Sequence, residues 1–216
     1  MIDDGSMSGD RVVSQGVDIV APAGDKSGAL EVDRSKRAVF IKGDEHLEFA
    51  GTRISVVHMG ITAPGGEKYV REVVKHPGAV VIVPVSANGE VHLLRQYRAP
   101  VGENLVEIPA GTRDVPGEPP EQTAHRELKE ELGLVADTLT LLGRVYNSPG
   151  FCTEETYIYL ATGLHQYEAE REGPEEMYME VLKLPLDEAI GLCTTGAIHD
   201  AQTIIGLMLA QRRLVG

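Results

Sequence analysis

The feature that most constrains this chain is the segment 121–132, which has the periodicity of a helix with one buried face. At about 100° per residue, three apolar side chains share one stripe: Ala124, Leu128 and Leu132. Three carboxylates fall beside that stripe, within an arc of about 100°: Glu127, Glu130 and Glu131. Gly133 follows and is typical of the residue that ends a helix. The segment therefore predicts a helix that packs on a core and carries a cluster of acids at the edge of that core.

The position of the three carboxylates does not favour helix stability. They occupy the last two turns, where negative charge opposes the helix dipole, and Glu127 repels Glu131 one turn further on. Each effect costs only about a few tenths of a kcal/mol, so a solvated acidic face is one explanation. The other explanation is a site for a hard divalent cation, which takes oxygen ligands and cancels the repulsion. The helix alone leaves both open.

The chain before this helix divides into two stretches. Residues 1–36 are rich in Gly, Ser and Asp, and we expect them to form a flexible extension. Residues 37–76 contain three short β-type runs with Gly- or Pro-bearing breaks between them: 38–41, 53–59 and 69–75. These runs predict an antiparallel β meander. Three strands are marginal alone, so the meander must pack on the rest of the chain or on a second copy.

Residues 77–216 read as one domain that mixes strands and helices. Asn88-Gly89 stands between the apolar runs 80–85 and 91–98 and predicts a β-hairpin. Further strands are expected at 105–108, 138–146, 156–161 and 180–184. Helices are expected from Pro120 to Leu132 and over 186–193 and 198–213. Helices mixed with a strand-rich core predict the α/β class.

Composition excludes several classes of function. The chain has 20 basic and 33 acidic residues, a net charge of −13, and no basic stripe. Such a chain is a poor candidate for binding nucleic acid or an anionic membrane through its charge. No apolar run reaches the roughly 18 residues of a membrane span, and no signal-peptide pattern is evident. Two cysteines, Cys152 and Cys193, do not make a disulfide framework, so we expect a soluble, cytoplasmic protein.

The spacing around the acidic helix resembles the signature of Nudix hydrolases. In that family a Gly is followed after five residues by Glu, and after seven more by Arg-Glu-aliphatic-any-Glu-Glu-any-Gly-aliphatic. This chain has Gly111, Glu118 and the run Arg126–Leu134, and every specified position from Glu118 onward matches. The departure is a gap of six residues after Gly111, in a Pro- and Gly-bearing loop that tolerates insertion.

Three further stretches are similar to the ADP-ribose pyrophosphatase subgroup: 96–98 with 107–111, 147–151, and 198–204. The resemblance implies a Nudix α/β/α sandwich with an N-terminal antiparallel β meander. It implies hydrolysis of ADP-ribose to AMP and ribose 5-phosphate with Mg²⁺, for which Mn²⁺ substitutes. The alternatives are a Nudix pyrophosphatase for another nucleoside diphosphate sugar, such as ADP-glucose or GDP-mannose, and a non-catalytic ADP-ribose sensor. The intact set of three glutamates argues against the sensor.

The resemblance also assigns roles at the metal site. It implies that Glu127 and Glu131 are metal ligands, joined by the carbonyl of Ala110. Glu130 is a further ligand or a catalytic group next to the metal. Arg126 either orients a glutamate or is a plain i, i+4 partner of Glu130. Glu118 is expected to support the site at the start of the helix.

Other roles follow from the subgroup. Glu175, ahead of the strand at 180–184, is the candidate base or extra ligand, with Glu176 its main competitor; a solvated run of acids is the alternative for both. Six residues are candidates for substrate binding: Arg98, Arg71, Glu107, Pro149, Gly150 and Phe151. Among these Arg71 is the weaker candidate, since an arginine on a surface strand is common. The subgroup implies a homodimer in which N-terminal strands of one subunit cover the other; a monomer whose meander folds back is the alternative.

Overall fold

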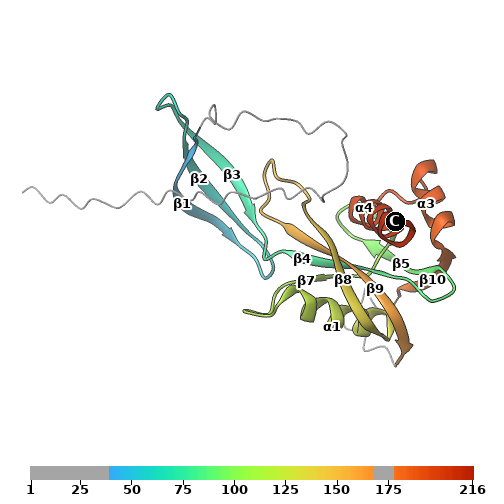
Figure 1. The fold of residues 1–216 in the computed structure, drawn as a ribbon. Coiled ribbons are helices and arrows are strands. Elements are labelled where there is room, and N and C mark those ends of the chain that lie inside the picture. The colour runs from blue at the N-terminus through green and yellow to red at the C-terminus, as the bar shows by residue number, and fades with distance from the viewer. Residues whose placement is uncertain (1–38, 168–177) are drawn as a thin grey trace, which may run out of the picture. The chain divides into compact units, whose positions relative to one another are not determined.

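The computed structural model describes residues 39–167 and 178–216 (Figure 1). The extension expected at 1–36 and the two loop glutamates, Glu175 and Glu176, lie outside the described residues. The chain divides into two compact units, Met1–His46 with His58–Arg71 and Leu47–Val57 with Glu72–Gly216.

The N-terminal strands form the expected antiparallel meander, in the order β1-β2-β3. Their bounds are β1 (Ile41–Ala50), β2 (Ser55–Thr62) and β3 (Lys68–Lys75). The first strand was predicted at 38–41, which is wrong, because β1 runs from Ile41 to Ala50. Every residue of β1 is exposed and five of its ten side chains are charged residues or histidine, so it has no buried face to mark it in the sequence.

The remaining strands form two sheets. The four-stranded sheet has the order β7 (Ala110–Thr112), β4 (Ala79–Pro84), β9 (Glu155–Gln166) and β8 (Leu134–Tyr146). The three-stranded sheet has the order β10 (Glu180–Pro185), β5 (Glu90–Arg98) and β6 (Glu103–Glu107). In the first, β4 is parallel to β9 and antiparallel to β7. The short strand β7 was not predicted, because three residues carry no periodicity.

The predicted hairpin at 80–98 is wrong as a strand pair, although its turn forms. Gly89 has φ +82°, and the amide of Ser86 donates to the carbonyl of Glu90 at 2.9 Å. Beyond an isolated bridge from Val85 to Val91, however, β4 and β5 separate into different sheets. Both edges of β4 are taken by β7 and β9, so no edge is left for β5.

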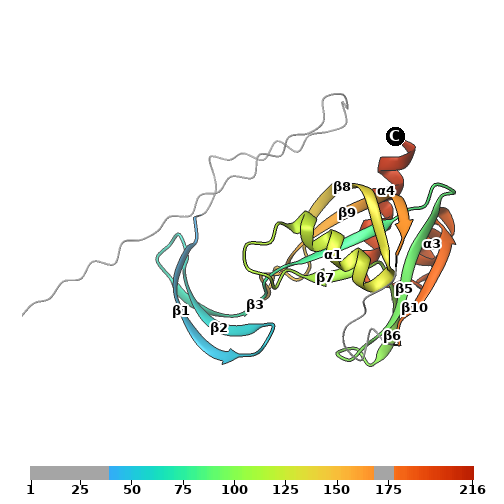
Figure 2. The ribbon, with the colours of Figure 1, turned by 90° about the horizontal axis from the view of Figure 1, so that it is seen from below.

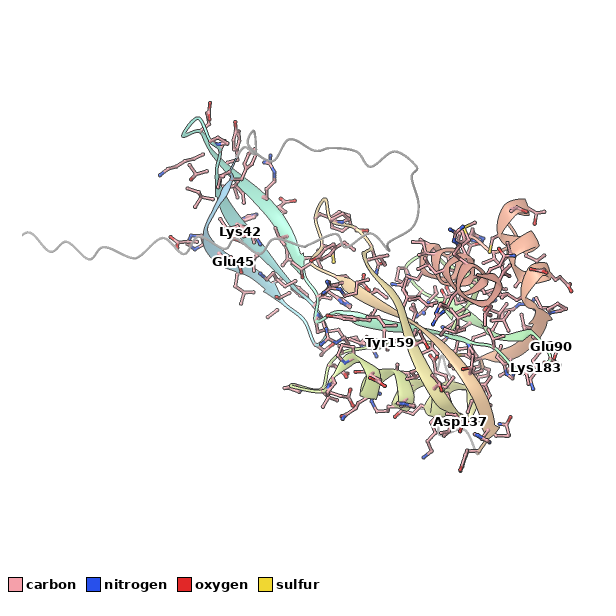
Figure 3. The ribbon with its side chains drawn as sticks, viewed as in Figure 1. Lys42, Glu45, Glu90, Asp137, Tyr159 and Lys183 are labelled. Carbon is pink, nitrogen blue, oxygen red and sulfur yellow. The ribbon has the colours of Figure 1, made fainter. Side chains whose placement is uncertain are left out.

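The pair β8–β9 extends further than its apolar runs suggest. β8 begins at Leu134 instead of 138, and β9 continues to Gln166 instead of 161. Asp137 and Gly163 interrupt the β-type pattern there, but the two strands pair to their ends, with Leu134 opposite Gln166. Asp137, labelled in Figure 3 at this end of the pair, accepts a hydrogen bond from Nε2 of His165 at 2.8 Å.

Among the described helices, the first and the last cover the two faces of the four-stranded sheet, and the middle one packs on the last helix and on β5 and β10 of the three-stranded sheet (Figures 1 and 2). In chain order they are α1 (Pro120–Leu132), α3 (Leu186–Thr195) and α4 (Ala201–Val215). Alternate β4 side chains divide between the faces: Val80 and Ile82 pack with α1, and Val81 and Val83 with α3 and α4. The fold is therefore the expected α/β/α sandwich.

The helix ends follow local chemistry. Gly133 adopts φ +62°, and its amide donates to the carbonyl of Lys129 at 2.9 Å, which ends α1 where the sequence predicts. The last helix was predicted from 198 but begins at Ala201. The carboxylate of Asp200 accepts from the amide of Thr203 at 2.7 Å and caps it.

Candidate active site

The carboxylates of α1 lie against β7. Glu131 Oε2 accepts a hydrogen bond from the backbone amide of Ala110 at 3.1 Å. Gly111, the next residue of β7, lies beneath the side chain of Glu127, and a Cβ built on it would overlap Cγ, Cδ and Oε1 of Glu127. Only glycine lets this carboxylate lie directly on the strand, which explains why the motif begins with that residue.

Glu127 and Glu131 are buried, with 9% and 4% of their surface exposed. Ionised carboxylates are seldom this buried unless a cation or several hydrogen-bond donors compensate the lost hydration. The apolar stripe of α1 causes the burial, because Ala124, Leu128 and Leu132 dock on the sheet and bring the neighbouring acids with them. The helix period therefore places two acids at the core edge, as the sequence predicts.

Arg126 gathers the acids around it. Its NH1 lies 2.8 Å from Glu127 Oε1 and 2.9 Å from Glu130 Oε2. Its NH2 lies 3.6 Å from Glu118 Oε2, which also accepts from the hydroxyl of Thr123 at 2.8 Å. Burial lowers the pKa of Arg126, but the surrounding carboxylates outweigh burial and leave that pKa above its ordinary value. Arg126 thus pairs with Glu127 as well as with Glu130, its i, i+4 partner.

Negative charge is in excess at this site. Five carboxylates surround or adjoin the single guanidinium of Arg126: Asp114, Glu118, Glu127, Glu130 and Glu131. An all-oxygen donor set that carries several negative charges suits a hard divalent cation. Within residues 39–167 and 178–216, no three acidic, His or Cys side chains already stand as a metal site. The oxygen donors are of the kind that a divalent ion takes, and in this structure Arg126 pairs with both Glu127 and Glu130.

Arg98 and Glu107, two candidates for substrate binding, are brought together. Nε of Arg98 lies 3.1 and 3.0 Å from the two carboxylate oxygens of Glu107, and NH2 lies 2.7 Å from Oε2. Gln96 donates to the same Oε2 at 2.8 Å. Burial lowers the pKa of Arg98, and the Glu107 carboxylate, with smaller effects of Glu131 and Asp200, raises it above its ordinary value. Arg98 therefore lies within the electrostatic reach of the α1 acids.

The family of the chain follows from a comparison with models of protein families. A family model described as NUDIX domain matches residues 75–205, which is more than half of the chain. The chain belongs to the Nudix family. This match confirms the resemblance drawn from Glu118 and the run Arg126–Leu134.

Two relatives of this chain carry the name ADP-ribose pyrophosphatase. That of Bacillus subtilis (strain 168) is 38% identical over 163 residues, which are 76% of this chain and 88% of that protein. That of Mycobacterium tuberculosis (strain H37Rv) is 42% identical over 148 residues, which are 68% of this chain and 72% of that protein. A crystal structure of an ADP compounds hydrolase superposes with a TM-score of 0.71 at 24% identity, covering 84% of this chain and 96% of that one. This last likeness shows the fold.

The remaining candidates for substrate binding lie on β3 and in the connection between β8 and β9. Arg71 is exposed on β3, donates to the carbonyl of Val70 at 3.1 Å, and stacks 5.5 Å from the ring of Tyr69. Pro149, Gly150 and Phe151 lie in the connection between β8 and β9. The carbonyl of Phe151 accepts from the amide of Val74 at 2.8 Å, so this loop is tied to the end of β3.

The structure adds residues that the sequence did not single out. Asp114 Oδ1 lies 3.9 Å from Arg126 NH2, within the longer loop after Gly111, where no spacing rule could locate it. Arg113 and Arg144 both lie over the ring of Tyr157, at 5.0 and 5.8 Å from its centroid. Tyr157 and Tyr159 pack on the α1 side of the sheet, and Figure 3 labels Tyr159 there.

The pKa of the Tyr159 hydroxyl is raised by burial and by the negative charge of Glu121, which outweigh the opposing effect of Arg113. No helix among the described residues is long and apolar enough to cross a membrane.

Proposed function

We propose that this chain hydrolyses the pyrophosphate bond of ADP-ribose and releases AMP and ribose 5-phosphate. The observation that carries the proposal is the buried pair Glu127 and Glu131 held against β7, in a chain that is 38% and 42% identical to two ADP-ribose pyrophosphatases. One water molecule is consumed, so that its oxygen ends on one phosphate and the bridging oxygen stays on the other.

The carboxylates of Glu127 and Glu131, with the carbonyl of Ala110, would hold a divalent cation, and Glu130 would lie next to it as a ligand or as a catalytic group. We assign this ion as Mg²⁺, with Mn²⁺ as a substitute, because all the donors are oxygen atoms. When bound, such an ion neutralises phosphate oxygens and lowers the pKa of a coordinated water.

The protein's own groups then position the substrate and the proton. Arg126 holds Glu127 and Glu130 in orientation through NH1. Arg98 presents a cation to a phosphate or ribose of the substrate, and Glu107 fixes the orientation of that guanidinium. Glu175, outside the described residues, is proposed to accept a proton from the attacking water. Arg71, Pro149, Gly150 and Phe151 remain proposed substrate contacts.

Product analysis tests the reaction. The purified chain is incubated with ADP-ribose, ADP-glucose, GDP-mannose and NADH, each with Mg²⁺ and with EDTA. We expect AMP and ribose 5-phosphate from ADP-ribose, in the Mg²⁺ arm only, at the highest kcat/KM of the panel. A higher kcat/KM for GDP-mannose or ADP-glucose would replace the substrate assignment. Tight binding of ADP-ribose without turnover would support the sensor instead.

The variant Glu131→Gln tests the ligand assignment, because it removes one charge at nearly constant shape. We expect its fold to persist and its turnover to fall by about two orders of magnitude or more. A variant that keeps more than about a tenth of the wild-type turnover at saturating Mg²⁺ would contradict the assignment. Far-ultraviolet circular dichroism controls for folding.

We also propose a cytoplasmic homodimer in which the meander covers the other subunit. Eight large apolar side chains of this region are exposed: Val39, Phe40, Ile41, Leu47, Phe49, Ile54, Tyr69 and Val70. A three-stranded sheet with this much exposed apolar surface needs a partner. Light scattering should give twice 23.3 kDa, and a monomer mass would refute the dimer.

Both cysteines are unpaired, which fits a reducing compartment.

A further inference from the structure

A cavity that the proposed reaction does not use lies where β3 ends, within the unit of Leu47–Val57 and Glu72–Gly216. It is a shallow depression open to solvent, with a volume of about 380 Å³. It is formed by the turn between β1 and β2, the segment after β3, and the loop before β9. Its lining is Gly51, Thr52, Arg53, Ile54, Ser55, Lys75, His76, Pro77 and Thr153.

The charge of this lining is opposite to that of the chain. Arg53, Lys75 and His76 supply basic groups, and no Asp or Glu is among the lining residues, although the chain carries a net charge of −13. Glu154 lies near the cavity, with Oε1 4.0 Å from Nδ1 of His76.

His76 is held in one orientation. Its Nδ1 accepts a hydrogen bond from the amide of Gly78 at 3.1 Å, so the neutral ring carries its proton on Nε2. Its own amide donates to the hydroxyl of Thr153 at 2.9 Å, and the amide of Thr153 donates to the carbonyl of Val74 at 2.9 Å. These bonds fix a half-buried ring, 17% exposed, whose Nε2–H remains a donor.

Arg53, in the same lining, is the exposed partner of this fixed donor. It lies in the turn after β1, which is closed by a hydrogen bond from the amide of Gly51 to the carbonyl of Ile54 at 2.8 Å. Arg53 is exposed, and in the described part of the chain no carboxylate pairs with it. A guanidinium offers paired N–H donors that match two phosphate oxygens.

We propose that this cavity binds the phosphate group of a phosphate monoester, through Arg53, Lys75 and the Nε2–H of His76. A phosphate ion alone would leave much of the 380 Å³ empty, so the organic part of an ester has room beside it. The site shares no residue with the α1 acids or with Arg98, so the inference does not depend on the proposed reaction.

The test is a titration of the full chain, in EDTA, followed by two-dimensional ¹H–¹⁵N NMR. Inorganic phosphate, AMP and ribose 5-phosphate are added separately, so that the free ion and the esters are distinguished. We expect saturable shifts below about 10 mM ligand, centred on the amides of 51–55 and 76–78, and tighter binding of an ester than of inorganic phosphate. Equal or tighter binding of inorganic phosphate would overturn the monoester assignment.

Matched variants locate the site. Arg53→Gln and Lys75→Gln should each weaken the binding about tenfold, since each removes a charged donor. The control is Lys68→Gln, which removes the same charge at the other end of β3 and should change the affinity by less than about twofold. Equal weakening by all three variants would indicate a general charge effect and overturn the proposal. Absence of saturable shifts, or shifts centred on α1 and β7, would overturn it as well.

Discussion

Replacing Gly111 by Ala is the sharpest test of how the active site is built. Gly111 lies on β7 with ordinary strand dihedrals, so its backbone accepts alanine without strain. The added Cβ would overlap Cγ, Cδ and Oε1 of Glu127, far inside the separation of about 3.5–4.0 Å that two carbon atoms prefer. The carboxylate of Glu127 must therefore retreat from β7 by more than about 1 Å.

This displacement should have a small effect on stability and a large effect on the catalytic rate. Overpacking costs about 1–3 kcal/mol, and the better strand propensity of alanine returns about 0.5–1 kcal/mol. The net cost is about 0–2.5 kcal/mol, so for a chain of this length we expect Tm to fall by no more than about 10 °C and the variant to stay folded at room temperature. A 1 Å misplacement of a catalytic group costs about 100-fold in rate, so kcat should fall by at least that factor.

The assay measures ADP-ribose turnover and, separately, Mn²⁺ binding by electron paramagnetic resonance. Gly143→Ala is the control, because Gly143 lies in the same sheet and its added Cβ would meet Leu209 Cδ1 at an ordinary 3.6 Å. We expect Gly143→Ala to keep turnover within about twofold and Mn²⁺ affinity unchanged. If Gly111→Ala keeps more than about a third of the wild-type turnover with intact Mn²⁺ binding, the close packing of Glu127 on β7 is not required.

Two further predictions concern pH and the loop. Burial, with a smaller effect of Lys183, lowers the pKa of His92, whose Nε2 lies 2.7 Å from the hydroxyl of Ser86. Because the pKa of His92 is lower in the folded chain, the unfolded chain binds a proton on this histidine more readily. The free energy of unfolding should therefore have its full value above about pH 6.5 and fall on acidification below it. Thermal melts between pH 7.5 and 5 should show a shallower loss for His92→Gln, and equal slopes would contradict this. Glu175→Gln should lower kcat far more than it raises KM, while Glu176→Gln does little; the reverse ranking would move the proposed base to Glu176.

The acidic helix and its ends could be predicted from the sequence because they depend on neighbours within four residues. The 3.6-residue period places Glu127 and Glu131 beside the apolar stripe, and Gly133 ends the helix in any context that lets it form. The fixed spacing from Glu118 to Leu134 identified the family before any contact was known.

Strand pairing could not be predicted in the same way. The Asn88-Gly89 turn forms as its chemistry requires, but which strand lies beside β4 depends on residues far away in the chain. The ends of β8 and β9 likewise depend on each other across the pair, and not on the residues next to them.

The sequence by itself determined the residue types of the site, and the tertiary structure decided what they touch. Glu127 lies on Gly111 because α1 docks on β7. Glu107 holds Arg98 because β5 pairs with β6. The cavity at Arg53 and His76 exists only because the end of β3 is tied to the loop before β9. Local periodicity depends on residues that are close in the sequence. A contact between distant segments depends on which faces and edges the whole fold buries.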